Sequence, residues 1–207
     1  MRAQMDRTGP QVGIGVILFG CLLVSSGLLT VGLTAMGLIH AGSAADGGAA
    51  QLPAMRAMHG LLLAGEILKT VLAVAFLVAI WTIQTARPIG SVRGGIGFLF
   101  GTAAGLLLMV AGRQGIVAAA QWGASIVPTD GAFVAMAGLG ATTLAGLWAA
   151  LTAYDLRLPG WMRMTGLALA ALGFAAVKWP LLGFAFGGLL LVWWLGLFHY
   201  FVRPART

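Results

Sequence analysis

The sequence predicts an all-α protein, a single polytopic bundle of six transmembrane helices with both termini in the cytoplasm. Of its 207 residues, 60% are hydrophobic and only 8% are charged, whereas a soluble domain has roughly 25% charged residues. The mean hydropathy is +0.98, so lipid must solvate most of the surface. The apolar residues form six runs with short polar connections, and about 20 apolar residues suffice to cross a membrane. We expect residues 1–207 to form one transmembrane domain.

The first predicted span covers residues 12–39 and follows a polar start that contains Arg2 and Arg7. This region is similar to a signal peptide with a cleavage site at residues 43–45, but its apolar run is longer than the usual 7–15 residues, roughly twice that length. We expect the span to be retained, and cleavage is the alternative. A loop rich in glycine and alanine then leads to the second predicted span, residues 58–83.

The third predicted span covers residues 95–111 and ends at Gly112 and Arg113. The connection that follows is moderately apolar and contains Trp122, so we expect an interfacial helix that lies against the lipid headgroups. Polar or proline-containing turns separate the last three predicted spans, which cover residues 132–152, 164–177 and 182–202.

The basic residues predict the orientation of the bundle. If the N-terminus is cytoplasmic, the inner segments carry eight arginines and the outer segments carry three basic residues. This asymmetry follows the positive-inside rule and predicts that both termini are cytoplasmic. The net charge is +7, but the basic residues form neither a run nor a stripe, so we expect no binding to nucleic acid.

Three glycines in the third span, Gly97, Gly101 and Gly105, are four residues apart and therefore share one helix face. Small residues at this spacing let helix backbones approach closely in lipid. We expect this face to be a helix-packing surface. The alternative is that the glycines reflect only a biased composition. The fourth span repeats this spacing, and the fifth span repeats it loosely, with the small residues Ala137, Ala141 and Ala145 in the fourth and Gly166, Ala170 and Gly173 in the fifth.

Glu66 and Lys69 lie inside the second predicted span, whereas almost every other ionisable residue lies at the edge of a span. Counted from Met58 at about 1.5 Å per residue, Lys69 is about 16 Å into a hydrocarbon core about 30 Å thick. An isolated charge at that depth costs at least about 2.5–3.5 kcal/mol. A spacing of three residues lets both side chains meet on one helix face, so we expect a mutual ion pair.

This pair has three interpretations. The first is a structural ion pair that gives specificity to the bundle, and the second is a site for a ligand, proton or ion. The third is that Lys69 extends to the membrane interface without pairing with Glu66. His59 lies seven residues before Glu66, on the same helix face, and Arg113 ends the third span. We therefore expect an intramembrane polar site formed by Glu66, Lys69, His59 and Arg113.

Metal or cofactor binding has weaker support in the sequence. His40 and His59 flank the first outer loop and are the candidates for copper or bis-histidine haem ligation. No HxxxH or similar metal-ligand spacing is present, so we expect no metal and no cofactor. The single cysteine, Cys21, lies in the middle of the first span. It has no disulfide partner within the chain, and we expect a buried, inert thiol.

The leading functional hypothesis is a non-catalytic accessory or assembly subunit of a larger membrane complex. The sequence contains no GxSxG motif, no phosphate-binding loop and no two carboxylates in one layer, so we expect no enzyme. The expected partners are membrane lipids and either other membrane subunits or further copies of the chain. One alternative is a small transporter or channel-like protein with a polar site at Glu66 and Lys69. Another is a haem-, quinone- or copper-binding membrane protein that uses His40 and His59.

Residues 12–151 resemble an uncharacterised family of small proteobacterial integral membrane proteins. The resemblance consists of Glu66 in the second span, the glycine-interrupted region 105–112 and the outer-loop sequence at residues 121–123. The acidic-aromatic motif that usually follows the third span in that family is absent here. Separately, residues 156–174 resemble a turn and span of another uncharacterised multi-span family. These resemblances imply a multi-pass protein of the bacterial inner membrane and bring no known activity with them.

Overall fold

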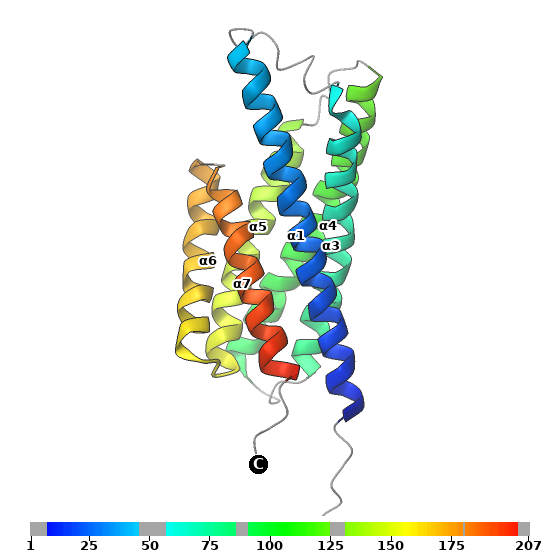
Figure 1. Cartoon of the computed structure of the whole chain (residues 1–207). Helices are drawn as coiled ribbons and strands as arrows, with labels where there is room; N and C mark the ends of the chain where they lie inside the picture. The colour runs from blue at the N-terminus through cyan, green and yellow to red at the C-terminus, as the bar shows by residue number, and fades with distance from the viewer. Residues whose placement is uncertain (1–7, 46–56, 86–90, 125–130, 180, 203–207) are drawn as a thin grey trace, which may run out of the picture.

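Six helices make up the computed structural model, which describes residues 8–45, 57–85, 91–124, 131–179 and 181–202 (Figure 1). In chain order the helices are α1 (Thr8–Ala45), α3 (His59–Thr85), α4 (Val92–Gly123), α5 (Gly131–Asp155), α6 (Gly160–Lys178) and α7 (Leu182–Val202). Each is long and apolar enough to cross a membrane. The all-α class and the six predicted helices are confirmed.

The helices form a closed ring in the order of the chain. Each helix packs against the next one, and α7 closes the ring by packing against α1. This last contact runs along much of both helices, from Gly15 beside Phe198 and Val202 to Gly32 beside Phe184. In contrast, α5 and α7 barely touch each other across the ring.

The ring has two distinct ends. The described part of the chain begins with α1 and finishes with α7 at one end of the bundle (Figure 1), which we call the proximal end. The opposite end, where α1, α4 and α6 finish, is the distal end. The helices differ most in length at this distal end. Figure 1 shows that α1, α3 and α4 extend beyond the turn between α6 and α7.

The extent of this projection follows from contacts between the helices. Gly32 of α1 lies level with Phe184, which is two residues into α7, because a Cβ on Gly32 would be 3.0 Å from the Phe184 ring. Helix α1 continues from Gly32 to Ala45. At about 1.5 Å per residue, α1 therefore extends roughly 15 Å past the start of α7.

Helix α4 differs from the sequence prediction. The predicted span over residues 95–111, with a separate interfacial helix after Arg113, is replaced by one continuous helix of 32 residues, Val92–Gly123. The charge of Arg113 does not end the helix, because its side chain is exposed and alanine-rich sequence favours continuation. The other five helices agree with the predicted spans within a few residues, except that α1 is extended at both ends.

Two features hold the proximal part of the bundle together. The first is an aromatic cluster of Phe76, Trp148, Trp193 and Trp194, whose ring centroids lie 5.0–6.5 Å apart. The three tryptophans are fully buried, and edge-to-face contacts among aromatic rings add about 0.5–1.5 kcal/mol per pair beyond burial. The second feature is the N-terminal cap of α4, where Ser91 Oγ accepts the Gly94 N–H at 3.0 Å and donates to the Asp155 carboxylate of α5.

The closest backbone approach lies between α5 and α6. A Cβ on Gly146 would be 2.6 Å from the carbonyl oxygen of Leu169, and a Cβ on Gly173 would be 2.9 Å from the Cα of Thr143. Thr143 Oγ1 also donates a hydrogen bond of 3.0 Å to the Gly173 carbonyl oxygen. Small residues thus join α5 and α6 through their backbones, as expected for helix packing in lipid.

Candidate functional site

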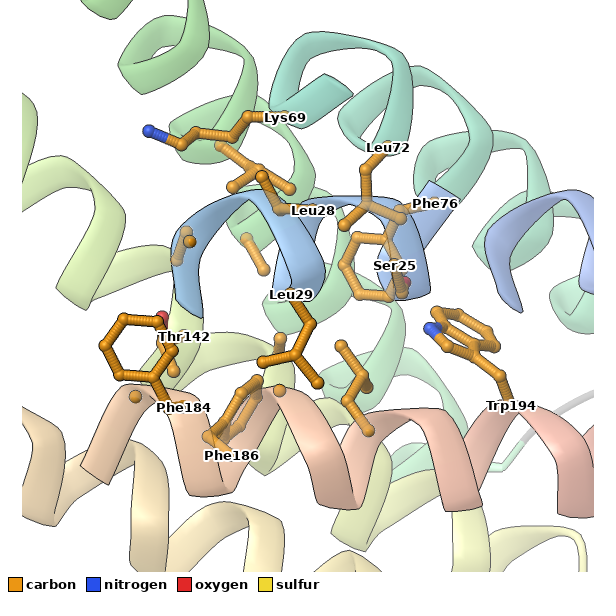
Figure 2. Close-up of a pocket in the computed structure, with 18 residues that line it drawn as sticks. Ser25, Leu28, Leu29, Lys69, Leu72, Phe76, Thr142, Phe184, Phe186 and Trp194 are labelled. Atoms are coloured by element: carbon orange, nitrogen blue, oxygen red, sulfur yellow. The ribbon is translucent and has the colours of Figure 1, made fainter. Parts of the chain in front are cut away.

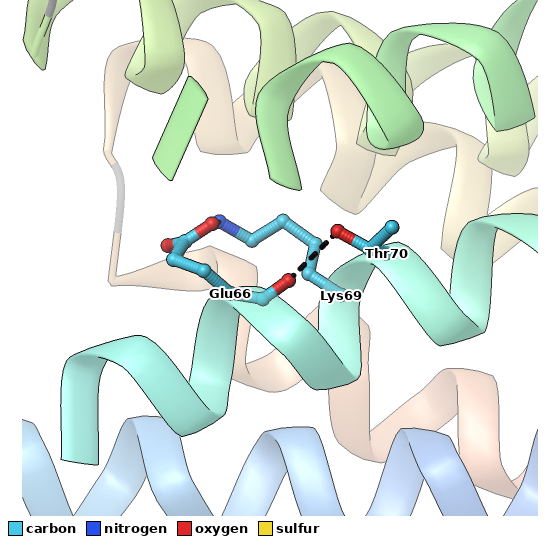
Figure 3. Close-up of polar contacts among 3 residues, drawn as sticks. All are labelled: Glu66, Lys69 and Thr70. Atoms are coloured by element: carbon cyan, nitrogen blue, oxygen red, sulfur yellow. Dashed lines mark hydrogen bonds and ion pairs between the residues drawn. The ribbon is translucent and has the colours of Figure 1, made fainter. Parts of the chain in front are cut away.

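The ion pair expected from the spacing of Glu66 and Lys69 is present on α3 (Figure 3). Lys69 Nζ donates to both carboxylate oxygens, at 2.7 Å to Oε1 and 2.6 Å to Oε2. Each side chain is 20% exposed. One turn later, Thr70 Oγ1 donates to the main-chain carbonyl oxygen of Glu66 at 3.0 Å. Two opposite charges on one helical face therefore neutralise each other locally.

Two glycines of α4 provide the space for this pair. A Cβ on Gly115 would overlap the Glu66 carboxylate, and a Cβ on Gly112 would overlap Thr70. Both glycines are buried. The sequence analysis assigned them to the end of a span and to a connection, so it missed their role. The signal that could have revealed it is the spacing of three between the glycines, which matches that of Glu66 and Lys69 on the facing helix.

The predicted glycine face on α4 is also a packing surface. A Cβ on Gly101 would be 2.6 Å from the Trp148 ring and 2.9 Å from Ile80, and a Cβ on Gly105 would be 2.6 Å from Leu77. Gly97 is buried on the same face. The face continues distally through Gly112 and Gly115, so the packing surface and the polar pair belong to one α3–α4 interface.

Two further residues of the predicted polar site, His59 and Arg113, are exposed. His59 lies in the first turn of α3, about two turns from Glu66, and Arg113 lies on α4. Among the residues that the structure describes, no three His, Cys, Asp or Glu residues are grouped to hold a metal ion. His40 lies in α1, but its side chain is outside the described part of the molecule. Cys21 is fully buried, as predicted.

The ion pair also lies closer to one end of the bundle than counting along α3 suggested. Gly65 faces Val31, and Gly187 faces Leu29. These contacts place Glu66 and Lys69 within about two helical turns of the distal end of α7, since a turn rises about 5.4 Å. The count from Met58 did not include how far α3 projects beyond the shorter helices, so the depth of Lys69 in the membrane stays a prediction.

A cavity of about 330 Å³ lies inside the ring, next to this layer (Figure 2). It is lined by residues of α1, α3, α4, α5 and α7, and Lys69 is one of them. Most of the other lining residues are aliphatic or aromatic. The sequence analysis did not predict this cavity, because it depends on which faces of five separate helices meet.

The cavity extends from the distal end of α7 toward the centre of the ring. Gly183 and Phe184 line it near the α6–α7 turn, and Phe76 and Trp194 line its inner end. These last two residues belong to the buried aromatic cluster, so the cavity is closed on the proximal side. Such an apolar space with a few polar groups is typical of a small-molecule site.

Six helices that are long and apolar enough to cross a membrane are typical of a multi-pass membrane protein. Comparison of the chain with protein-family models, with curated proteins and with solved structures finds no match to any of them. The resemblance to a family of small integral membrane proteins therefore stays a prediction, and the functional argument depends on the geometry of the chain itself.

Proposed function

We propose that this chain is a non-catalytic integral protein of the bacterial inner membrane that acts as an accessory or assembly subunit of a larger membrane complex. The observation that carries the proposal is the distal projection of α1 and α4. Helices α6 and α7, with 19 and 21 residues, match a hydrocarbon core about 30 Å thick. A bilayer fitted to them leaves the distal ends of α1 and α4 outside the core.

The projecting end of α1 carries exposed apolar side chains. Met36 and Leu38 are 38% and 49% exposed. A cluster of exposed apolar groups outside lipid favours coverage by another protein. Hydrophobic mismatch between helices of one bundle also favours association. With the proximal end in the cytoplasm, as the arginine distribution favours, the partner covers the outer face of the membrane.

Purification in a mild detergent followed by mass spectrometry tests the proposal. We expect the wild-type chain to retain a partner, either a different membrane subunit or a second copy. The variant M36A/L38A should lose that partner. The matched control F19A/L23A changes two residues of the same helix that are 48% and 55% exposed and should keep it. A monomer without any partner would contradict the proposal.

A second candidate function is a small carrier or channel-like protein with its polar site at Glu66 and Lys69. The contribution of Lys69 to the cavity lining favours it. Because aromatic residues close the proximal side, transport would need a rearrangement of Phe76 and Trp194. A cysteine at Leu108, in a Cys21→Ser background, tests for it. A transport path predicts labelling by a membrane-impermeant thiol reagent from both sides of the membrane, whereas a blind cavity predicts labelling from the distal side only.

A further inference from the structure

We propose that the interior cavity binds an uncharged, lipophilic carbonyl compound, such as the ring of a quinone. Its carbonyl oxygen would accept hydrogen bonds from Trp194 and Ser25. This site is separate from the projecting helix ends that carry the proposed subunit function, so either proposal can fail without the other.

The first argument is that, among the buried polar atoms that lack a hydrogen-bond partner in the described part of the chain, two line the cavity. Ser25 Oγ and Trp194 Nε1 both lack such a partner, although Ser25 is only 6% exposed and Trp194 is fully buried. Leaving such a group unsatisfied costs about 1–3 kcal/mol. Both residues line the cavity, and in Figure 2 the indole nitrogen of Trp194 points toward Ser25.

Ser25 is unusual among the hydroxyl side chains of these helices. Thr30, Thr34 and Thr142 each donate to the carbonyl oxygen four residues earlier, at 2.8–2.9 Å. This local bond is the usual way for a hydroxyl inside a helix to be satisfied. The hydroxyl of Ser25 does not form it and remains available toward the cavity. Trp194 Nε1 is only a donor, so the two groups together fit an acceptor oxygen.

The second argument is the chemistry of the cavity walls. Beyond the polar inner end, the lining is formed by apolar side chains such as Leu28, Leu72, Leu108 and Phe184. A volume of about 330 Å³ lies at the lower end of the range of small-molecule sites, roughly 300–1,000 Å³. The cavity therefore fits a compact apolar molecule with an oxygen atom at one end.

The third argument concerns charge. The one cationic group of the lining, Lys69, already holds both carboxylate oxygens of Glu66. An anionic ligand would have to compete with that carboxylate and would be repelled by it. A carboxylate ligand is thereby disfavoured, and a neutral carbonyl compound is favoured.

The test is a set of thermal unfolding titrations in detergent with three probes of similar shape. The probes are 2,3-dimethyl-1,4-naphthoquinone, 2,3-dimethylnaphthalene, which lacks the oxygens, and 2-naphthoate, which carries a charge. A ligand that binds only the folded state raises the unfolding temperature as its concentration increases. We expect saturable stabilisation by the quinone and much weaker effects of the other two probes.

Variants assign the effect to the cavity. S25A and W194F should each weaken quinone binding about three- to tenfold, which is the value of one neutral hydrogen bond. A141F, which places a ring in the cavity, should abolish binding. W81F is the matched control, because Trp81 is 66% exposed and does not line the cavity. If A141F does not fold, A104L is the replacement variant, because it places a smaller side chain in the same cavity.

Two results would overturn the proposal. Equal stabilisation by the hydrocarbon and the quinone would show that the buried polar atoms play no part. Unchanged quinone binding in both S25A and W194F would place the ligand elsewhere on the protein.

Discussion

At the scale of single residues, Glu66 and Lys69 are tied together because each would otherwise be a lone charge in an apolar bundle. Each side chain is 20% exposed. The cost of removing one partner should therefore lie between the roughly 1 kcal/mol of an exposed pair and the about 3–5 kcal/mol of a buried pair. The pairing thus lowers the cost of having two charges in an apolar bundle and adds little to the overall stability.

The first prediction is a double-mutant cycle on this pair. E66L and K69L should each lower the unfolding temperature in detergent, because each leaves one charge without its partner. The double variant E66L/K69L should recover much of the loss, since no charge is left. Thermal unfolding of the four proteins measures this. Single variants as stable as the wild type would show that each charge reaches water independently.

The second prediction concerns Arg157 in the turn between α5 and α6. Its φ is 51°, and the turn is a Schellman motif in which Leu158 N–H bonds to Ala153 O and Arg157 N–H bonds to Tyr154 O. This position favours glycine. R157G should raise stability by about 0.5–1 kcal/mol.

The control is R157A, which removes the same exposed side chain but keeps a Cβ. It should bring no gain in the free energy of unfolding. Stabilisation of both variants to the same degree would attribute the effect to the lost charge instead of the backbone.

At the scale of helices, glycines allow α5 and α6 to approach each other closely. The third prediction is that G146A lowers stability by about 1–3 kcal/mol, the usual cost of overpacking. The new methyl group would meet the main chain at Leu169 and Ala170, which has little freedom to move.

Gly138 provides the comparison on the same helix, since nothing lies within 4 Å of a Cβ there. G138A should be neutral or slightly stabilising, because alanine favours a helix more than glycine does. Unfolding temperatures of the two variants in one detergent decide the matter. If both variants unfold at the same temperature, the close α5–α6 backbone contact does not make the Gly146 position more sensitive to a methyl group than the Gly138 position.

The positions of the helices were largely predictable from the sequence, and their packing was predictable only in part. Apolar runs of sufficient length mark a span whatever its neighbours are, so four helices agree with the prediction within a few residues and α1 is extended at both ends. The end of α4 was misplaced, because one arginine was read as a membrane boundary. Gly101 and Gly105 were found from their spacing. Gly146 and Gly115 were missed, because their importance depends on the residue that faces them.

The candidate site shows the same division. The Glu66–Lys69 pair is local in sequence, so spacing alone predicted it. The cavity and its inner end at Ser25 and Trp194 combine residues from five helices. No local pattern encodes such a space. Likewise, the depth of the ion pair depends on how far α3 projects beyond α7, which is a property of packing.

At the scale of the whole molecule, the fourth prediction concerns orientation. The arginine distribution favours a cytoplasmic proximal end. A phosphatase that is active only outside the cytoplasm, fused after Thr207, should therefore be inactive. A fusion at residue 49, which lies between α1 and α3 in the sequence, should be active. Enzyme activity in whole cells measures both. An active fusion at the C-terminus would reverse the assignment of the two ends.

The ring of helices also has a consequence for how the protein is made. Every helix contact except one joins helices that follow each other along the chain or lie close to each other in it, so most of the bundle can assemble while the ribosome is still translating. The exception is the contact between α1 and α7. It forms only after the last helix has been inserted, and until then the interior is open to lipid along α1. A nascent chain that stops after α6 would therefore contain four helix–helix interfaces and an incomplete cavity, so the final helix decides when the proposed ligand site forms.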